Sequence, residues 1–448
     1  MDFFYILCYS IIHQQSERSI EEVWKMKLFK RENYLKKIRG FYHEDDIIKV
    51  ITGVRRCGKS SLMKTIADEL VDSAVPQENI IYIDLDRRGF RNVNTADALE
   101  RCIDEKGKPE GLKYLFIDEI QNVKDFETVI NGYRTDGGWS IFITGSNSYL
   151  LSGELVTKLT GRYLEFEMFP LSFSEYEDMK RFYSKSVNEN MLVELTNYIL
   201  ESGFPRTVNI DDPTDKRKYV QGVINEIFEK DIRKRVKIRN RETFEVVRHY
   251  IINNFGSTTS INGICEALRK NGLGVGKATV SRYIKALVDA KILYECDRFD
   301  MKSKKSLSGE KKYYLSDLGF YFADNTDNRV NYGPTLENIL YIYARSRECA
   351  VSVGRIGKLE CDFIIRNSNM SYSYVQVAYT IALSRETEDR EYRPLEMIKD
   401  NYPKYILTTD YLLQNRNGII HENIIDFIRD EKDLLSERAS GKKSGRSD

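Results

Sequence analysis

One motif constrains the fold of this chain more than any other feature. Residues 53–60 read Gly-Val-Arg-Arg-Cys-Gly-Lys-Ser and match the pattern G-x-x-x-x-G-K-[ST]. An apolar run at 47–51 precedes the motif, and apolar residues at 62, 63, 66 and 70 follow it at helical spacing. A strand, a glycine-containing turn and a helix in this order predict a loop that binds phosphate groups. The alternative is an ordinary glycine-rich turn.

The residue types in this motif suit the chemistry of phosphate binding. Glycines let the backbone turn tightly, so that successive N–H groups point at the phosphates. We expect Lys59 to contact the β- and γ-phosphates of ATP, and the Ser60 hydroxyl to bind Mg²⁺. The predicted nucleotide-binding residues are Gly53, Val54, Arg55, Arg56, Cys57, Gly58, Lys59, Ser60 and Ser61.

Two adjacent carboxylates form a second candidate motif. Asp118 and Glu119 directly follow the apolar run at 114–117. Asp118, at the tip of this strand, is predicted to hold Mg²⁺ through water, and Glu119 to orient and polarise the water that attacks ATP. The alternative is a strand that ends in acidic residues at the surface. The phosphate-loop motif upstream favours the catalytic interpretation.

The spacing of apolar runs predicts the fold of the first part of the chain. Such runs occur at 47–51, 80–83, 114–117 and 140–143, with helical stretches between them, and residues 163–168 alternate like one more strand. This pattern indicates an α/β fold of the P-loop NTPase type, a parallel sheet with helices on both faces. We expect a helical and winged-helix module and a C-terminal nuclease-like α/β domain to follow.

The expected boundaries divide the chain into six parts. They are a poorly ordered extension at 1–25, the P-loop ATPase core at 26–172, a helical lid or linker at 173–254, a winged-helix-like module at 255–325, the nuclease-like domain at 326–436 and a disordered tail at 437–448.

Two further segments of the ATPase core are candidates for contact with the γ-phosphate. Residues 144–148 read Thr-Gly-Ser-Asn-Ser after a predicted strand, so Ser146 or Asn147 is placed to report the nucleotide state. Arg162, in Leu-Thr-Gly-Arg at 159–162, carries a guanidinium that can neutralise charge on the transferred phosphoryl group. If a neighbouring subunit supplies Arg162, it is an arginine finger and the protein is a homo-oligomer. The alternatives are an ordinary turn and an exposed arginine before a strand.

The charge balance excludes a chain-wide basic surface for nucleic acid. Lys and Arg number 69 and Asp and Glu number 68, for a net charge of +1.

The seven cysteines contain no C-x-x-C pair, which favours a reducing cytosol over a disulfide framework or a zinc site. The apolar run at 3–12 is too short for a spanning helix, which needs about 20 apolar residues. We therefore expect a cytoplasmic protein without a membrane segment.

Residues 255–300 have the pattern of a winged helix. Helices are expected at 261–268 and 277–287, and Val280, Ile284 and Leu287 would form the buried stripe of the second. A basic ribbon from Lys302 to Lys312 would be the wing. The module is expected either to contact DNA or to serve as a packing or protein-binding unit, with an unidentified protein as partner. The residues predicted for DNA contact are Lys277, Ser281, Arg282, Lys285 and the Lys302–Lys312 ribbon.

The C-terminal part has the outline of a restriction-nuclease-like fold without a complete active site. Glu337 is predicted on a helix, Asp362 on a strand, and Gln376 on the next strand at an acidic-ligand position. Ala378 stands where such a site needs a lysine to assist the attacking water. We therefore expect a degenerate module kept for binding, without nuclease activity.

Taken together, the motifs resemble those of a family of prokaryotic AAA-type ATPases with a C-terminal domain of unknown function. The resemblance covers residues 26–430 and rests mainly on 53–61, 116–121 (Phe-Ile-Asp-Glu-Ile-Gln), 144–148 and 159–162. Shorter matches are at 169–173, 203–205, 231–232, 336–338, 360–363 and 375–377. The resemblance implies an AAA-type core at 26–172 that binds and hydrolyses ATP. It implies no particular substrate.

Three functions are compatible with these residues. The first is an ATP-hydrolysing switch or motor that acts on the appended modules, and the second is an ATP-regulated DNA-binding protein with slow hydrolysis. The third is a metal-dependent nuclease gated by ATP. The intact pair of Asp118 and Glu119 favours turnover, and Ala378 argues against the nuclease.

Overall fold

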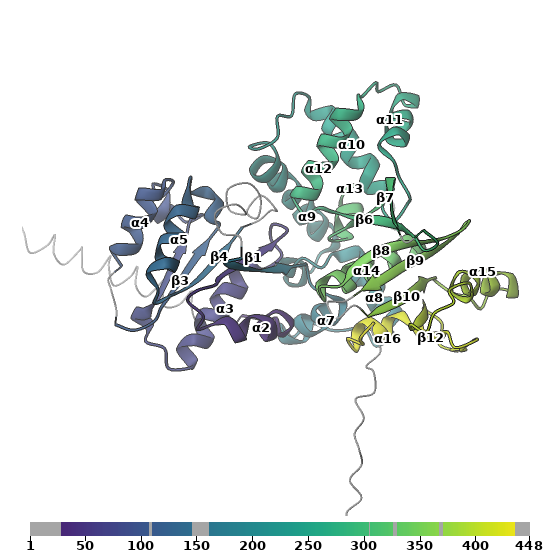
Figure 1. The fold of residues 1–448 in the computed structure, drawn as a ribbon, viewed down its shortest axis with the longest axis horizontal. Coiled ribbons are helices and arrows are strands. Elements are labelled where there is room, and N and C mark those ends of the chain that lie inside the picture. Colours follow the sequence, from purple (N-terminus) through teal and green to yellow (C-terminus); the bar gives the residue numbers. More distant parts are fainter. Residues whose placement is uncertain are drawn as a thin grey trace, which may run out of the picture.

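The computed structural model describes residues 28–106, 110–145, 161–303, 305–325, 329–366 and 371–434. The extension expected at 1–25 and the tail expected at 437–448 lie outside these residues. Figure 1 shows a sheet with flanking helices from the N-terminal part of the chain, a helical unit beside it, and a second sheet from the C-terminal part.

The first sheet is fully parallel and has the strand order β2-β3-β4-β1-β5. Its strands are β1 (Ile48–Gly53), β2 (Ile80–Asp84), β3 (Lys113–Asp118), β4 (Trp139–Thr144) and β5 (Tyr163–Met168). All five strands coincide closely with the apolar or alternating segments of the sequence, so the predicted P-loop NTPase fold is confirmed. In this order β1, which leads into residues 53–60, lies between β4 and β5.

Helices cover both faces of this sheet. Alternate residues of each strand point to opposite faces, so Phe116 and Phe142 pack on the side of α2 (Glu32–Ile38) and α3 (Lys59–Asp72). Leu115 and Ile141 pack on the other side. The helices on that side are α4 (Ala96–Asp104) and α5 (Phe126–Asp136).

A helical unit follows the sheet. Its first helix begins at a capping box, in which the Ser172 hydroxyl accepts from the backbone N–H of Glu175 and the Glu175 carboxylate accepts from the N–H of Ser172. The elements are α7 (Phe173–Phe182), α8 (Met191–Glu201), the 3₁₀ turn η6 (Pro205–Asn209), α9 (Pro213–Ile227), the π-helical turn η7 (Phe228–Ile232), α10 (Arg241–Asn253), α11 (Ile261–Lys270), α12 (Lys277–Asp289) and α13 (Gly319–Asp324).

The second sheet joins the region expected to be a winged helix to the C-terminal unit. An antiparallel hairpin of β6 (Leu293–Asp300) and β7 (Lys305–Leu315) follows α12, and β6 pairs in parallel with β8. The seven-stranded order is β12-β11-β10-β9-β8-β6-β7. This sheet crosses the boundary expected at 325 and 326. The remaining elements are α14 (Tyr332–Ser346), β8 (Ala350–Ile356), β9 (Leu359–Arg366), β10 (Tyr372–Val377), α15 (Arg385–Glu396), β11 (Lys404–Thr408), β12 (Ile420–Asn423) and α16 (Ile424–Arg429).

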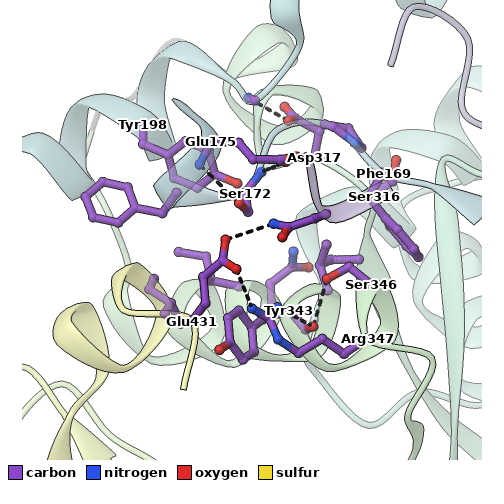
Figure 2. Close-up of a pocket in the computed structure, with 18 of the residues that line it drawn as sticks. Phe169, Ser172, Glu175, Tyr198, Ser316, Asp317, Tyr343, Ser346, Arg347 and Glu431 are labelled. Carbon is purple, nitrogen blue, oxygen red and sulfur yellow. Dashed lines mark hydrogen bonds and ion pairs between the residues drawn. The ribbon is translucent and has the colours of Figure 1, made fainter. Parts of the chain in front are cut away.

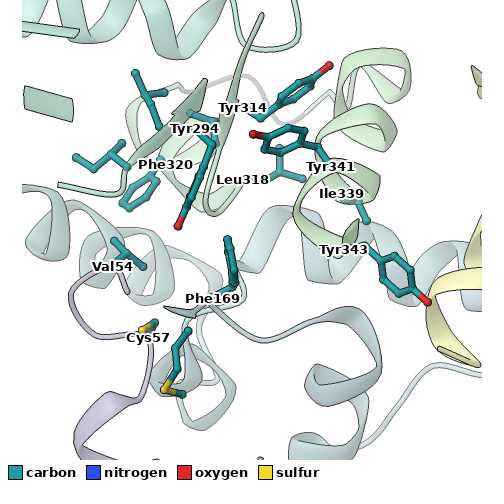
Figure 3. Packing of buried hydrophobic residues seen from close by; sticks show 14 of the residues in the cluster. Val54, Cys57, Phe169, Tyr294, Tyr314, Leu318, Phe320, Ile339, Tyr341 and Tyr343 are labelled. Atoms are coloured by element: carbon teal, nitrogen blue, oxygen red, sulfur yellow. The ribbon is translucent and has the colours of Figure 1, made fainter. Parts of the chain in front are cut away.

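One apolar core connects the units (Figure 3). In the loop at 53–60, Val54 and Cys57 belong to this core. Phe169, which follows β5, contacts Tyr294 of β6 with ring centroids 5.3 Å apart. Tyr314 of β7 stacks on Tyr341 of α14 at 4.4 Å. The ATPase sheet and the second sheet are therefore packed against each other through large aromatic side chains.

None of the helices in the described part of the chain is both long and apolar enough to cross a membrane.

Candidate nucleotide-binding site

Residues 53–60 form a tight loop between β1 and α3, as the motif predicts. Gly53 has φ +143° and Gly58 has φ +111°, in a region that side chains with a Cβ rarely adopt. A Cβ on Gly53 would lie 2.2 Å from the backbone oxygen of Met168 on β5. Gly58 is the N-cap of α3, so the positive end of this helix faces the loop. The backbone thus offers N–H groups to an anion, as a phosphate cradle requires.

Lys59 lies across this loop. Its side chain is buried, and Nζ donates hydrogen bonds to the carbonyl oxygens of Gly53 (3.0 Å) and Val54 (3.1 Å). The ammonium group is therefore held at the inner surface of the loop, where the β- and γ-phosphates of a bound nucleotide are expected.

The strand β3 brings Asp118 to the beginning of α3. Asp118 is 2% exposed, and burial raises the pKa of its carboxyl group, whereas hydrogen bonds from Ser60 and Thr144 lower it. A hydroxyl and a carboxylate, both hard oxygen donors, thus lie side by side, and this donor set fits Mg²⁺. Thr144, at the end of β4, donates to Asp118 and accepts from the backbone N–H of Glu119 at 3.0 Å.

Glu119 is held in the left-handed region, with φ +59°, directly after β3. Gln121 Nε2 donates to its carboxylate, and Nη2 of Arg55 is 3.6 Å from Oε2. Burial raises the pKa of Glu119, whereas the positive charges of Lys59 and Arg55 lower it. The carboxylate is therefore fixed beside the phosphate loop rather than extended into solvent.

Lys59, Ser60, Asp118 and Glu119 line one pocket of about 610 Å³. Asp84 and Asp86, at and just after the end of β2, also line it, and so does the exposed Arg206, which lies in η6 directly after Gly-Phe-Pro. Thr144 and Arg206 were not among the predicted site residues. The sequence signal for Arg206 is weak, because the loop that carries it lies far from the phosphate loop in the chain.

Arg162 lies away from this pocket. It precedes β5, which runs parallel to β1, so it lies at the edge of the sheet where these strands begin, whereas the phosphate loop follows the end of β1. Its carbonyl accepts from the N–H of Ile48 (3.0 Å), and Nη1 donates to Asn131 Oδ1 (3.3 Å). Arg162 therefore does not reach the nucleotide pocket of its own chain. The predicted Ser146 and Asn147 lie outside the described residues.

The surface predicted to contact DNA is only partly exposed. Lys277, Ser281, Arg282 and Lys285 of α12 all face solvent, as expected. Lys312, at the end of the basic ribbon, does not face solvent. Its ammonium group is buried between the carboxylates of Glu337 on α14 and Glu360 on β9. Including Lys312 in the DNA-contact surface was therefore wrong. Lys311 is paired with Glu295 and Asp297, Lys302 and Lys305 are exposed, and Lys304 lies outside the described residues.

The predicted acidic residues of the C-terminal unit lie on α14 and β9, where Lys312 and backbone groups contact them. Lys312 Nζ is 3.0 Å from Glu337 Oε2 and 2.9 Å from Glu360 Oε1. The backbone N–H of Val377 donates to Asp362 at 2.8 Å. Among the described residues, no group of three or more histidine, cysteine, aspartate and glutamate side chains is placed to hold a metal ion. Lys312 of β7, which the sequence predicted as part of the wing, thus lies among the carboxylates.

A second, smaller cavity lies where the units meet (Figure 2). Its volume is about 210 Å³, and it is lined from α2, the start of α7, the segment just after β7, α14 and Glu431, which follows α16. The buried Ser316 hydroxyl lines it without a hydrogen-bond partner in the described part of the chain. The predicted site residues contribute nothing to this cavity.

Comparison with known proteins agrees with the fold. Residues 45–177 match the family model of an AAA domain, and residues 192–327 match a domain of unknown function (DUF8612). This second match covers most of the helical unit and the β6–β7 hairpin. Fold and site together define an AAA-type P-loop protein.

Two relatives extend the similarity over most of the chain. An uncharacterised protein of Haemophilus influenzae is 33% identical over 404 residues, which are 90% of this chain and 98% of that protein. An uncharacterised protein of Methanocaldococcus jannaschii is 31% identical over 364 residues, 79% of each. The chain belongs to the family of these two proteins, and the predicted prokaryotic AAA-type family with a domain of unknown function is thereby confirmed.

Solved structures are more distant. A Walker-type ATPase of Pyrococcus abyssi aligns with a TM-score of 0.47 at 15% identity, over 67% of this chain and 99% of that one. AMPPCP-bound DnaA from Aquifex aeolicus aligns with a TM-score of 0.31 at 14% identity, over 60% of this chain and 91% of that one.

Proposed function

We propose that this protein binds ATP with Mg²⁺ and hydrolyses it to ADP and phosphate, and that hydrolysis acts on the appended modules. One observation carries the proposal: Lys59, Ser60, Asp118 and Glu119, which are separated by up to 60 positions in the chain, line a single pocket beside the loop at 53–60. Lys59, Asp118 and Glu119 are buried, and hydrogen bonds hold each of these three side chains in place.

Each of these residues has a distinct part in hydrolysis. The loop amides and Lys59 bind the phosphates, while Ser60 and Asp118 would hold Mg²⁺, which supplies charge neutralisation when bound. Glu119 orients a water molecule and accepts its proton as the oxygen attacks the γ-phosphorus. The bond from that phosphorus to the bridging oxygen breaks, and ADP leaves with the electron pair.

Two substitutions test this proposal. Lys59→Ala removes the cation at the phosphates and is expected to weaken ATP binding by at least 100-fold in calorimetry. Glu119→Gln keeps the shape but not the base, so we expect ATP affinity within about threefold of wild type and a turnover at least 100-fold lower. Micromolar ATP binding by Lys59→Ala, or unchanged hydrolysis by Glu119→Gln, would contradict the assignment.

A second candidate function is nucleotide-regulated DNA binding with slow hydrolysis. The observation that favours it is the exposed face of α12, where Lys277, Arg282 and Lys285 accompany Ser281 while Val280 on the opposite face is buried. The order of α10, α11, α12 and the β6–β7 hairpin supports the interpretation as a winged helix, in which α12 would be the helix that enters the major groove.

Binding to double-stranded DNA tests this candidate. The triple substitution Lys277→Ala, Arg282→Ala and Lys285→Ala is expected to weaken binding at least tenfold at low salt. It should also flatten the plot of log affinity against log salt, by about 0.9 for each DNA phosphate that the protein no longer neutralises. Anisotropy at two salt concentrations, with ADP and with a slowly hydrolysed ATP analogue, measures both effects, alongside ATPase rates with and without DNA.

The matched control for this experiment removes the same number of charges elsewhere. Lys36, Lys106 and Lys124 are exposed on the ATPase unit, and replacing all three by alanine should leave DNA affinity within twofold. If both triple variants weaken DNA binding equally, the binding depends on the overall positive charge of the protein and not on α12.

A further inference from the structure

One positively charged side chain of the phosphate loop lies beside the proposed catalytic carboxylate. Arg55 is the third residue of the loop and is 7% exposed. Its Nη2 lies 3.6 Å from Glu119 Oε2, and both side chains line the same pocket as Lys59. A group that orients the attacking water lies next to the γ-phosphate, so a guanidinium at this distance from it is also next to the phosphoryl group being transferred.

A buried aspartate fixes the direction of this guanidinium. Asp231 is 2% exposed and accepts from Arg55 through both oxygens, with Nε to Oδ2 at 2.9 Å and Nη2 to Oδ1 at 3.0 Å. A bidentate pair of this kind sets the plane of the guanidinium as well as its position. The edge of the Arg55 guanidinium that carries Nε and Nη2 faces Asp231. Nη2 therefore lies between the carboxylates of Asp231 and Glu119.

We propose that Arg55 supplies, within the same chain, the guanidinium that neutralises charge on the transferred phosphoryl group, and that Asp231 positions it. The proposal rests on the function proposed above. As the water oxygen bonds to phosphorus and the bond to the ADP oxygen breaks, negative charge spreads over the phosphoryl oxygens, and a preoriented guanidinium stabilises it. Arg55 thus takes the part that the sequence suggested for Arg162.

Asp231 also connects Arg55 to the helical unit. Asp231 belongs to the π-helical turn η7, which links α9 to the segment leading into α10. Insertions of π-helix occur frequently at functional sites. From α9, Glu226 reaches the neighbouring Arg56 at 3.0 Å and Nη1 of Arg55 at 3.7 Å. A partner that moves α10 to α12 would therefore change the direction of Arg55 through Asp231.

The competing interpretation is that Arg55 only clamps the phosphate loop to the helical unit. A clamp affects folding and ground-state binding of ATP, whereas a group that stabilises the transition state affects kcat. Aluminium fluoride bound with ADP mimics the transferred phosphoryl group, so its binding separates the two interpretations. If Arg55 stabilises the transition state, its loss weakens binding of ADP with aluminium fluoride more than binding of ATP. If Arg55 only clamps the loop, its loss weakens both equally.

The experiment compares Arg55→Ala, Arg55→Lys and Asp231→Asn in the full chain. We expect Arg55→Ala to lower kcat at least 100-fold, with KM for ATP and affinity for ATPγS changed less than tenfold, and to lose tight binding of ADP with aluminium fluoride. Arg55→Lys should recover less than a tenth of the activity, since an ammonium cannot make the bidentate pair. Asp231→Asn should lower kcat about tenfold while ATPγS affinity is kept.

The control is Arg233→Ala, which removes an exposed arginine two residues after Asp231 that pairs with Glu229 on the surface. It should keep kcat within twofold. If Arg55→Ala keeps kcat within threefold, or weakens ATPγS and ADP with aluminium fluoride equally, Arg55 is a clamp and the proposal is wrong.

Two further measurements separate this proposal from others. Mixing inactive Arg55→Ala chains with inactive Glu119→Gln chains should restore nothing, because both groups act on the nucleotide of their own chain. Recovered activity would overturn the same-chain assignment. If wild type itself neither binds nor hydrolyses ATP, the proposed function fails, whereas activity that needs Glu119 and not Arg55 defeats only this further inference.

Discussion

At the residue scale, backbone conformation decides the nucleotide site before any side chain does. Gly53 closes β1 with φ +143° while its Cα faces the backbone oxygen of Met168 on the neighbouring strand. No side chain fits there, and the turn that directs the loop amides inward depends on this approach. The first glycine of the motif is therefore required by the packing of β5 against β1 as well as by phosphate binding.

Replacing this glycine tests that requirement. Gly53→Ala would place a Cβ at 2.2 Å from a backbone oxygen in a strained conformation, so we expect a loss of about 2 kcal/mol or more in unfolding free energy, together with loss of ATP binding. Gly132→Ala in α5, where nothing lies within 4 Å of the added Cβ, should be neutral or stabilising by up to about 1 kcal/mol. Urea denaturation measures both, and equal effects would contradict the explanation.

At the element scale, the hairpin of β6 and β7 belongs to two units at once. Helix α12 packs on β6 and helix α14 packs on β7, and β6 also pairs with β8. Lys312 on β7 reaches across to Glu337 of α14 and Glu360 of β9. Lys312, a predicted wing residue, is therefore buried and forms ion pairs that connect the hairpin to the C-terminal unit.

Removing this lysine is expected to destabilise the protein in a pH-dependent way. Lys312→Ala leaves two carboxylates facing each other without their cation, which costs about 3 kcal/mol. Burial raises the pKa of Glu337, so its proton is kept to higher pH in the folded than in the unfolded chain, and stability falls as pH rises from about 4 towards that raised pKa. Lys312 lowers the pKa of Glu337, so that pKa rises further without it, and the loss caused by the substitution should be larger at pH 8 than at pH 5.

The adjacent lysine provides the comparison. Lys311 is partly exposed and pairs with Glu295 and Asp297, so Lys311→Ala should cost less than about 1 kcal/mol at either pH. Denaturation curves at pH 5 and pH 8 for both variants decide the matter. A loss for Lys312→Ala that does not grow with pH would mean that the carboxylates are not its main partners.

At the scale of the whole molecule, the phosphate loop is packed against the rest of the chain. Arg31, before α2, donates to the carbonyls of Cys57 (3.0 Å) and Phe169 (2.8 Å) and forms a buried pair with Glu175 of α7. The aromatic core continues from there to Tyr294 and onward to α14 (Figure 3). Packed side chains thus connect the nucleotide site to the second sheet without a break.

The order of residues along the chain is enough to predict the first sheet and most of its site. Each strand is a short apolar or alternating run, and the polar groups at 53–60 and at 118 and 119 follow strands directly, so local order places them at the same edge of a parallel sheet. Periodicity and motif spacing predict the positions of these polar groups because each position is set by the strand and turn that carry the group. Contacts with distant segments are not needed to place them.

Other features depend on contacts between distant segments and emerge only in the folded chain. Arg162 lies at the wrong edge of the sheet because β5 runs parallel to β1, and Lys312 is buried because β6 pairs with β8. The pairing of Arg55 with Asp231 joins residues 176 positions apart. No local pattern reports such contacts, since they arise only when the strand order and the packing of the helical unit bring the side chains together.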